Sequence, residues 1–189
     1  MNFDFSKIDK TWTLFLDRDG VINVEKKGDY VLQVDGFIFS EGATEALKIL
    51  SRIFGLIVVV TNQRSIAKQL MTLEDLHTIH AYMLEEINKH EGRIDRIYFC
   101  GDMNDESPNR KPNPGMALQA KKDYAQIDFS KSIMVGNTIS DMQFARNAGM
   151  YAVFIPSTEP GTPFPHKLID ARYNSLFDFA KDIGHLIKH

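Results

Sequence analysis

Two aspartates near the start of the sequence, Asp17 and Asp19, have the spacing of a carboxylate pair that could act on a phosphate ester. Side chains two residues apart point the same way in an extended chain, and Gly20 allows the backbone to turn directly after them. Carboxylates this close repel each other, which raises the pKa of one unless a cation lies beside them. Magnesium suits such a pair because it prefers oxygen ligands, including those of phosphate groups.

The chemistry open to this pair is a two-step phosphoryl transfer. A carboxylate can attack phosphorus and form an aspartyl-phosphate, which divides hydrolysis into two easier steps. The second carboxylate, while protonated, can donate a proton to the leaving alcohol and then accept one from water. The pair therefore predicts one nucleophile and one acid–base group.

Three further segments carry polar groups that this reaction could use. They are Thr61-Asn62-Gln63, Arg110-Lys111 and the run from Gly136 to Asp141, which includes Asn137. A transferring phosphoryl group spreads negative charge over its equatorial oxygens, so hydrogen-bond donors and cations stabilise it. Lys111, the Thr61 hydroxyl and the backbone N–H of Asn62 match that need, and Arg110 could hold a second anionic group through two hydrogen bonds.

The polar segments follow short apolar runs that alternate with helical patterns. The apolar runs span 12–16, 56–60, 94–99, 132–135 and 151–155, and the helical patterns span 45–53, 72–92, 114–124, 140–149 and 175–187. This alternation predicts a doubly wound, three-layer α/β fold with a mostly parallel sheet and helices on both faces. Ligands bind beyond the carboxyl ends of such strands, so the four polar segments are expected to meet there.

Length and composition favour one domain with a small-molecule ligand. The 189 residues leave no sizeable block outside the alternation, so we expect a single domain over 1–189 without a large cap domain. The net charge of −3 gives no electrostatic footprint for nucleic acid. The N-terminal residues lack the apolar core of a signal peptide or membrane span. We therefore expect a cytoplasmic protein without nucleic-acid or membrane partners, a monomer or weak homodimer.

Four segments resemble the motifs of the haloacid dehalogenase superfamily, specifically its histidinol-phosphate and heptose-bisphosphate phosphatases. They are LFLDRDGVIN, VVVTNQ, RKPNPGM and MVGNTISD, and the resemblance covers about residues 12–155. It implies strand order 3-2-1-4-5. It also implies that Asp17 is the nucleophile and a magnesium ligand, that Asp19 is the acid–base group and binds metal through its backbone carbonyl, and that Lys111 neutralises nucleophile and phosphate. The substrate-binding residues assigned on this basis are Thr61, Asn62, Gln63 and Arg110.

The fourth motif departs from the family pattern, which has Gly-Asp where this chain has Gly136-Asn137. An asparagine can still coordinate magnesium through its carbonyl oxygen, but more weakly. Asp141 could bind the metal directly, hold its water, or pair with Lys111. The expected metal-binding residues are Asp17, Asp19, Asn137 and Asp141, and weak magnesium affinity or low turnover is predicted.

Two other departures concern the loops. Many relatives carry a zinc loop of cysteines and a histidine before RKPNPGM, whereas here the segment offers only Cys100, with Asp102, Ser107 and Asn109 nearby. Structural zinc needs about four nitrogen or sulfur ligands, so no structural zinc is expected. Ser65 stands where relatives usually have glycine, and its hydroxyl could alter the mouth of the pocket.

The favoured function is a magnesium-dependent phosphatase acting on a small phosphorylated metabolite, a sugar phosphate such as heptose 1,7-bisphosphate. A histidinol-phosphate phosphatase is one alternative. Another is a protein that binds phosphorylated ligands with impaired turnover because of Asn137. A receiver domain is disfavoured, because no lone acceptor aspartate closes the third predicted strand. Residues 22–40 and 100–110 are expected to shape the pocket.

Overall fold

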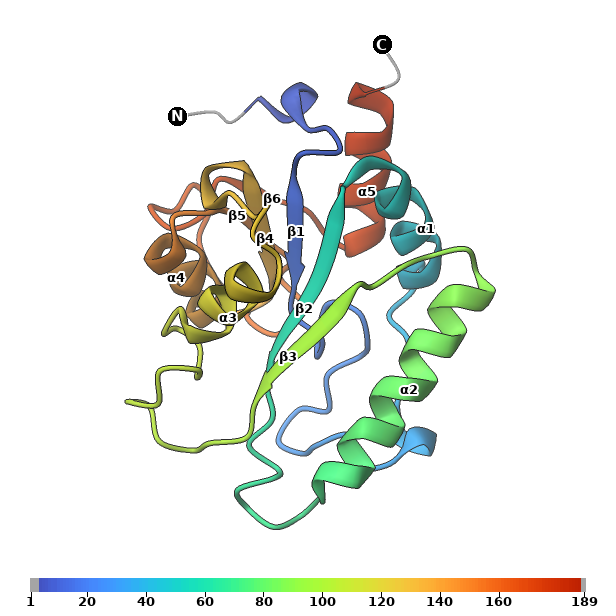
Figure 1. Ribbon diagram of the computed structural model, residues 1–189, viewed down its shortest axis with the longest axis vertical. Coiled ribbons are helices and arrows are strands. Elements are labelled where there is room, and N and C mark those ends of the chain that lie inside the picture. The colour runs from blue at the N-terminus through green and yellow to red at the C-terminus, as the bar shows by residue number, and fades with distance from the viewer. Residues whose placement is uncertain (1–3, 188–189) are drawn as a thin grey trace.

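The computed structural model describes residues 4–187, which contain a six-stranded sheet in which every strand pair is parallel (Figure 1). The strands are β1 (Thr13–Leu16), β2 (Leu56–Asn62), β3 (Arg96–Cys100), β4 (Ser132–Gly136), β5 (Tyr151–Phe154) and β6 (Ala171–Arg172). Their order is β3-β2-β1-β4-β5-β6, which confirms the doubly wound α/β fold and the expected order of the first five strands. The two-residue β6 was not predicted.

Helices cover both faces of the sheet (Figure 1). They are α1 (Ala43–Ile53), α2 (Leu73–Lys89), α3 (Gly115–Asp123), α4 (Ile139–Ala148) and α5 (Leu176–Leu186), with short 3-10 helices at Phe5–Lys7, Val34–Gly36 and Phe129–Lys131. Side chains alternate along β1: Leu14 and Leu16 pack with α1, α2 and α5, whereas Phe15 packs with α3 and α4. This division gives the three predicted layers.

Most helix ends follow their sequence signals. Thr72 and Asp75 form a capping box at the start of α2, and Gly149 is left-handed, with φ 83°, at the end of α4. The predicted helical pattern over 72–92 extends too far, because α2 stops at Lys89 and the left-handed residue is Glu91, with φ 61°. A Cβ at Gly92 would lie 2.8 Å from the Ile87 side chain, so close packing explains this glycine.

The two long connections that follow β1 and β3, residues 17–42 and 101–114, both begin at the carboxyl edge of the sheet. They lie beside the ends of β2 and β4, where the predicted site residues are found. None of the helices in residues 4–187 combines the length and apolar character needed to span a lipid bilayer.

Candidate active site

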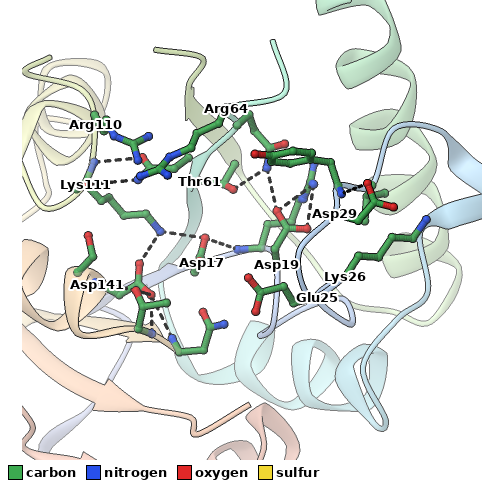
Figure 2. Close-up of a pocket in the computed structure, with 18 of the residues that line it drawn as sticks. Asp17, Asp19, Glu25, Lys26, Asp29, Thr61, Arg64, Arg110, Lys111 and Asp141 are labelled. Atoms are coloured by element: carbon green, nitrogen blue, oxygen red, sulfur yellow. Dashed lines mark hydrogen bonds and ion pairs between the residues drawn. The ribbon is translucent and has the colours of Figure 1, made fainter. Parts of the chain in front are cut away.

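The predicted site residues meet in one cavity of about 620 Å³ at the carboxyl edge of the sheet (Figure 2). All nine line it: Asp17, Asp19, Thr61, Asn62, Gln63, Arg110, Lys111, Asn137 and Asp141. They come from the ends of β1, β2 and β4, from the start of α4 and from the loop before α3. The convergence follows from parallel pairing, which places the carboxyl ends of neighbouring strands side by side.

Lys111 lies between two buried carboxylates. Its Nζ is 2.9 Å from Asp17 Oδ1 and 2.6 Å from Asp141 Oδ1, as the dashed lines in Figure 2 show. The Lys111 and Asp141 side chains are 3% and 2% exposed. Charges this deep are stable only when paired, so the lysine holds the two aspartates together.

The ionisation of Asp17 reflects opposing effects. Burial raises the pKa of its carboxyl, the Lys111 ammonium lowers it and the neighbouring Asp141 raises it, and together they bring this pKa to about 7. Burial acts to lower the pKa of Lys111, but Asp141 and Asp17 outweigh burial and raise it. A cation bound next to Asp17 would favour the ionised form, which is the form able to attack phosphorus.

Asp19 is held by three side chains around the cavity. Arg18 Nη2 and Asn23 Nδ2 each donate to Asp19 Oδ1 at 3.0 Å, and Gln63 Nε2 donates to Asp19 Oδ2 at 2.9 Å. Burial alone would raise the pKa of Asp19, but the Arg18 charge and these hydrogen bonds bring it below the ordinary value. Gln63 also donates to Thr61 Oγ1 at 2.9 Å and so links the ends of β1 and β2.

Asn62 joins the end of β2 to the backbone of Lys111. Its Oδ1 accepts from Lys111 N at 3.1 Å, and its Nδ2 donates to Lys111 O at 3.2 Å. These two hydrogen bonds fix the backbone of Lys111. The sequence did not predict this contact. The expected contact of the Asn62 backbone N–H with phosphate stays a prediction.

Asp141 uses both carboxylate oxygens within the protein. Oδ1 accepts from Lys111, and Oδ2 accepts from the backbone N–H groups of Asn137 and Thr138 at 3.1 and 3.0 Å and from Thr138 Oγ1 at 2.8 Å. Of the three roles left open for Asp141, the structure shows the pairing with Lys111.

Arg110 organises the loop between β3 and α3. Its Nε donates to Asp105 Oδ1 at 2.8 Å and its Nη1 to Asp102 O at 3.1 Å, while Ser107 Oγ donates to Asp102 Oδ2 at 2.6 Å. The side chain of Arg110 is 3% exposed, so much of its donor capacity serves the loop. In residues 4–187 no group of three or more histidine, cysteine or acidic side chains is arranged to hold a metal. The expected absence of zinc stays a prediction.

Other cavity-lining residues were missed by sequence reasoning. They are Arg18, Glu25, Lys26, Gly28, Asp29, Tyr30, Val31, Arg64, Lys68, Thr138, Ser140 and Glu159. Those from the 22–40 loop lie within the segment that was expected to shape the pocket. Lys68 Nζ is 5.1 Å from the Tyr30 ring centroid and brings that loop against the one after β2. Ser65 is fully buried and does not line the cavity, so the expectation that its hydroxyl alters the pocket mouth is wrong.

Behind the site, a neutral histidine supports Arg18. Arg18 is 1% exposed, and its Nη1 lies 3.2 Å from His80 Nε2. Because a guanidinium can only donate, this nitrogen of His80 accepts and its ring is neutral. Burial, followed by the Arg18 charge, lowers the pKa of His80 to about 3.

His80 should therefore make the fold sensitive to mild acid. The unfolded chain takes up this proton below pH 6.5 and the folded chain does not, so stability falls as pH drops from 6.5 towards 3. We expect His80 to account for about 2 kcal/mol of lost unfolding free energy between pH 7 and 5. Urea unfolding at both pH values should show a smaller loss for His80→Asn. The exposed His77 provides the matched control. A smaller loss of unfolding free energy for His77→Asn than for His80→Asn would contradict the assignment of this effect to His80.

The comparisons with known proteins agree with this geometry. Residues 5–149 match the family model described as haloacid dehalogenase-like hydrolase. The chain is 35% identical over 175 residues, 92% of each chain, to the D-glycero-alpha-D-manno-heptose-1,7-bisphosphate 7-phosphatase of Mycobacterium bovis. It is 36% identical over 179 residues, 90% of this chain and 92% of the other, to the D-glycero-beta-D-manno-heptose-1,7-bisphosphate 7-phosphatase of Escherichia coli K12.

A solved structure shows the same arrangement of elements. The D,D-heptose 1,7-bisphosphate phosphatase of B. bronchiseptica, complexed with magnesium and phosphate, superposes with a TM-score of 0.82 and 25% identity, covering 91% of this chain and 97% of the other. The family match spans the strands and loops that bring Asp17, Thr61 and Lys111 into one cavity. The chain therefore belongs to the haloacid dehalogenase-like hydrolase family.

Proposed function

We propose that this protein is a magnesium-dependent phosphatase that hydrolyses a sugar bisphosphate, with heptose 1,7-bisphosphate as the favoured substrate. The observation that carries the proposal is the position of Lys111 Nζ, 2.9 Å from Asp17 in a cavity that also contains Asp19 and Thr61. The relatives described above, which span nearly the whole chain, bear the name of this activity.

In the proposed reaction, an Asp17 carboxylate oxygen attacks phosphorus as the bond from phosphorus to the leaving oxygen breaks. Asp19 gives its proton to that oxygen, so an alcohol leaves. A water then attacks the aspartyl-phosphate, passes a proton to Asp19 and releases phosphate, which restores Asp17. The negative charge of a bound phosphate raises the pKa of Asp19 and so favours the protonated form that the first step needs.

Donors from the end of β2 and from the loop before α3 are placed to stabilise the transferring group. Lys111 contributes positive charge beside Asp17, and the Thr61 hydroxyl and Asn62 backbone N–H lie at the end of the neighbouring strand. The Gln63 contact with Thr61 Oγ1 at 2.9 Å restricts that hydroxyl. These fixed donors need little rearrangement as charge develops on the phosphoryl oxygens.

The donor set fits magnesium. Asn137 is 1% exposed and its Oδ1 has no hydrogen-bond partner among residues 4–187, which leaves a buried carbonyl oxygen free for a ligand. Asp17, the backbone carbonyl of Asp19 and Asn137 would hold the ion. Magnesium would supply positive charge that offsets the repulsion between Asp17 and phosphate. Because both oxygens of Asp141 have protein partners, we propose that Asp141 orients Lys111 and Asn137 instead of binding the ion directly.

The cavity also has a cationic side that suits a second phosphate. Arg64, Lys26 and Lys68 line it together with Arg110, and Figure 2 shows Arg64 and Lys26 on different sides of Asp19, with the amino group of Lys26 pointing away from it. The Arg64 side chain is 51% exposed, and its ion pair with Asp105, at 3.9 Å, is at the limit of contact. Arg64 is therefore available to bind a ligand, whereas the buried Arg110 is already engaged by the loop.

The substrate is tested by measuring phosphate release with magnesium from both anomers of heptose 1,7-bisphosphate, from heptose 7-phosphate and from histidinol phosphate. We expect the highest kcat/KM for one bisphosphate anomer. Preference for histidinol phosphate would replace the proposed substrate with the alternative. Binding of bisphosphates without release of phosphate would overturn the enzymatic proposal in favour of the binding protein. Cytoplasmic location and a monomer or weak homodimer stay predictions.

Arg64→Ala should weaken the binding of bisphosphates more than that of monophosphates. We expect KM for the bisphosphate to rise at least about tenfold, the size of one charged hydrogen bond. Because Arg64 is expected to contact only the second phosphate, KM for heptose 7-phosphate should change less than about twofold. Steady-state kinetics on both substrates measure this, with Arg52→Ala on the exposed face of α1 as the control. An equal rise in KM for both substrates would show that Arg64 does not recognise the second phosphate.

A further inference from the structure

The amide of Asn137 is fixed at one end and unpartnered at the other. Its Nδ2 donates to Thr158 Oγ1, and its buried Oδ1 has no hydrogen-bond partner in the described structure. Asn137 follows β4, whereas Thr158 lies in the loop after β5. A Cβ at Gly20 would lie 2.0 Å from Asn137 Nδ2, so the turn after Asp19 packs directly against the amide.

A carboxylate sets the direction of this hydrogen-bond chain. Thr158 Oγ1 donates its single proton to Glu25 Oε2, because an ionised carboxylate can only accept. The Thr158 oxygen must then accept from Asn137, and of the two ends of the amide only Nδ2 can donate. The chain from Glu25 through Thr158 therefore determines which end of the Asn137 amide, in the cavity lining, remains without a hydrogen-bond partner.

The orientation matters because an amide, unlike a carboxylate, has a single oxygen. An aspartate at position 137 would offer an oxygen ligand in either orientation of its carboxyl group, whereas a rotated asparagine would present an NH₂ group that cannot coordinate a cation. An asparagine at this position thus requires an acceptor on its Nδ2 side. Thr158 provides that acceptor, and Glu25 holds the Thr158 hydroxyl in the required direction.

We propose that Thr158 and Glu25 are positioning residues that turn the Asn137 carbonyl oxygen towards magnesium and so compensate for the missing fourth-motif carboxylate. The inference rests on the proposed use of magnesium at this site. Hydrogen-bond partners of a metal ligand fix its orientation, and their loss typically weakens metal binding about 10- to 100-fold.

The test compares one substitution in two backgrounds by calorimetric titration of the metal-free protein with Mg²⁺. In the native chain, Thr158→Val should weaken Mg²⁺ binding at least about tenfold, since it removes the acceptor with little change of shape. In an Asn137→Asp background, which should itself bind Mg²⁺ more tightly, the same substitution should change affinity less than about twofold. Thr158→Ser keeps the hydroxyl and should retain native affinity.

Thr162→Val, in the same loop, is the matched control, because the hydrogen bonds the structure gives Thr162 use its backbone atoms. Thermal unfolding without Mg²⁺ checks that each variant folds. Equal losses from Thr158→Val in both backgrounds, or none in the native chain, would overturn the inference. If neither the native chain nor Asn137→Asp binds Mg²⁺, the proposed metal dependence fails instead, so the two failures are distinguishable.

Discussion

Asp17→Asn is expected to lower the rate of phosphate release by about 10⁴-fold or more, because an amide oxygen is a poor nucleophile towards phosphorus. The substitution preserves shape, and Asn Oδ1 can still accept from Lys111, which lies 2.9 Å from Asp17 Oδ1. Inorganic phosphate should bind at least as tightly as to the native protein, since one negative charge has been removed from the cavity. Turnover at saturating magnesium and phosphate titration measure the two effects.

The control for Asp17→Asn is Asp35→Asn, the same loss of charge at an exposed position outside the cavity. This control should keep native turnover. Retention of more than about 1% of the native rate in Asp17→Asn would remove Asp17 from the role of nucleophile, provided that thermal unfolding shows a folded variant.

Lys111→Met should affect both catalysis and stability. Loss of the cation beside the transferring phosphoryl group is expected to lower kcat about 10²- to 10³-fold. It also leaves Asp17 and Asp141 buried together without a counter-charge, so we expect the unfolding free energy at pH 8 to fall by about 3 kcal/mol. Urea unfolding and steady-state kinetics provide these values.

Acid should partly restore the stability of Lys111→Met relative to the native protein. In the native protein the pKa of Asp17 is already raised to about 7, against the lowering effect of Lys111. Without the ammonium this pKa is higher still, so between pH 8 and 5.5 the folded variant gains more stability from binding a proton than the native protein does. Its stability deficit should therefore be smaller at pH 5.5 than at pH 8. Lys122→Met, on the exposed side of α3, should stay within about 0.5 kcal/mol of the native protein. A deficit that does not depend on pH would contradict the ion-pair explanation.

The three layers of the fold and the location of the site could be predicted from the sequence, because both depend on the periodicity of apolar residues. Apolar runs with polar residues directly after them identify strands, and parallel pairing then places Asp17 and Thr61 at one edge. Sequence spacing does not determine which way a side chain turns, so the choice between metal and lysine for Asp141 required the structure.

The structural features that the sequence did not predict lie in segments without a regular pattern of apolar and polar residues. Thr158 is in the proline-rich segment after β5, which predicts only a loop, and its contact with Glu25 joins residues 133 positions apart. The two residues of β6 are too few for a pattern. Gly92 misleads in the opposite way. Glycine is typical of helix ends, but at this position close packing against Ile87 explains it.

The polar contacts of Arg110 determine which conditions can loosen the loop between β3 and α3, which forms one wall of the pocket. A wall held by thiolates and zinc opens when chelators remove the ion or oxidants modify sulfur. Here the wall depends on a guanidinium and on the carboxyl of Asp105, whose pKa is lowered by its hydrogen bond and charge interaction with Arg110. The part of the wall that this ion pair holds should thus be insensitive to chelators and should loosen when acid protonates Asp105.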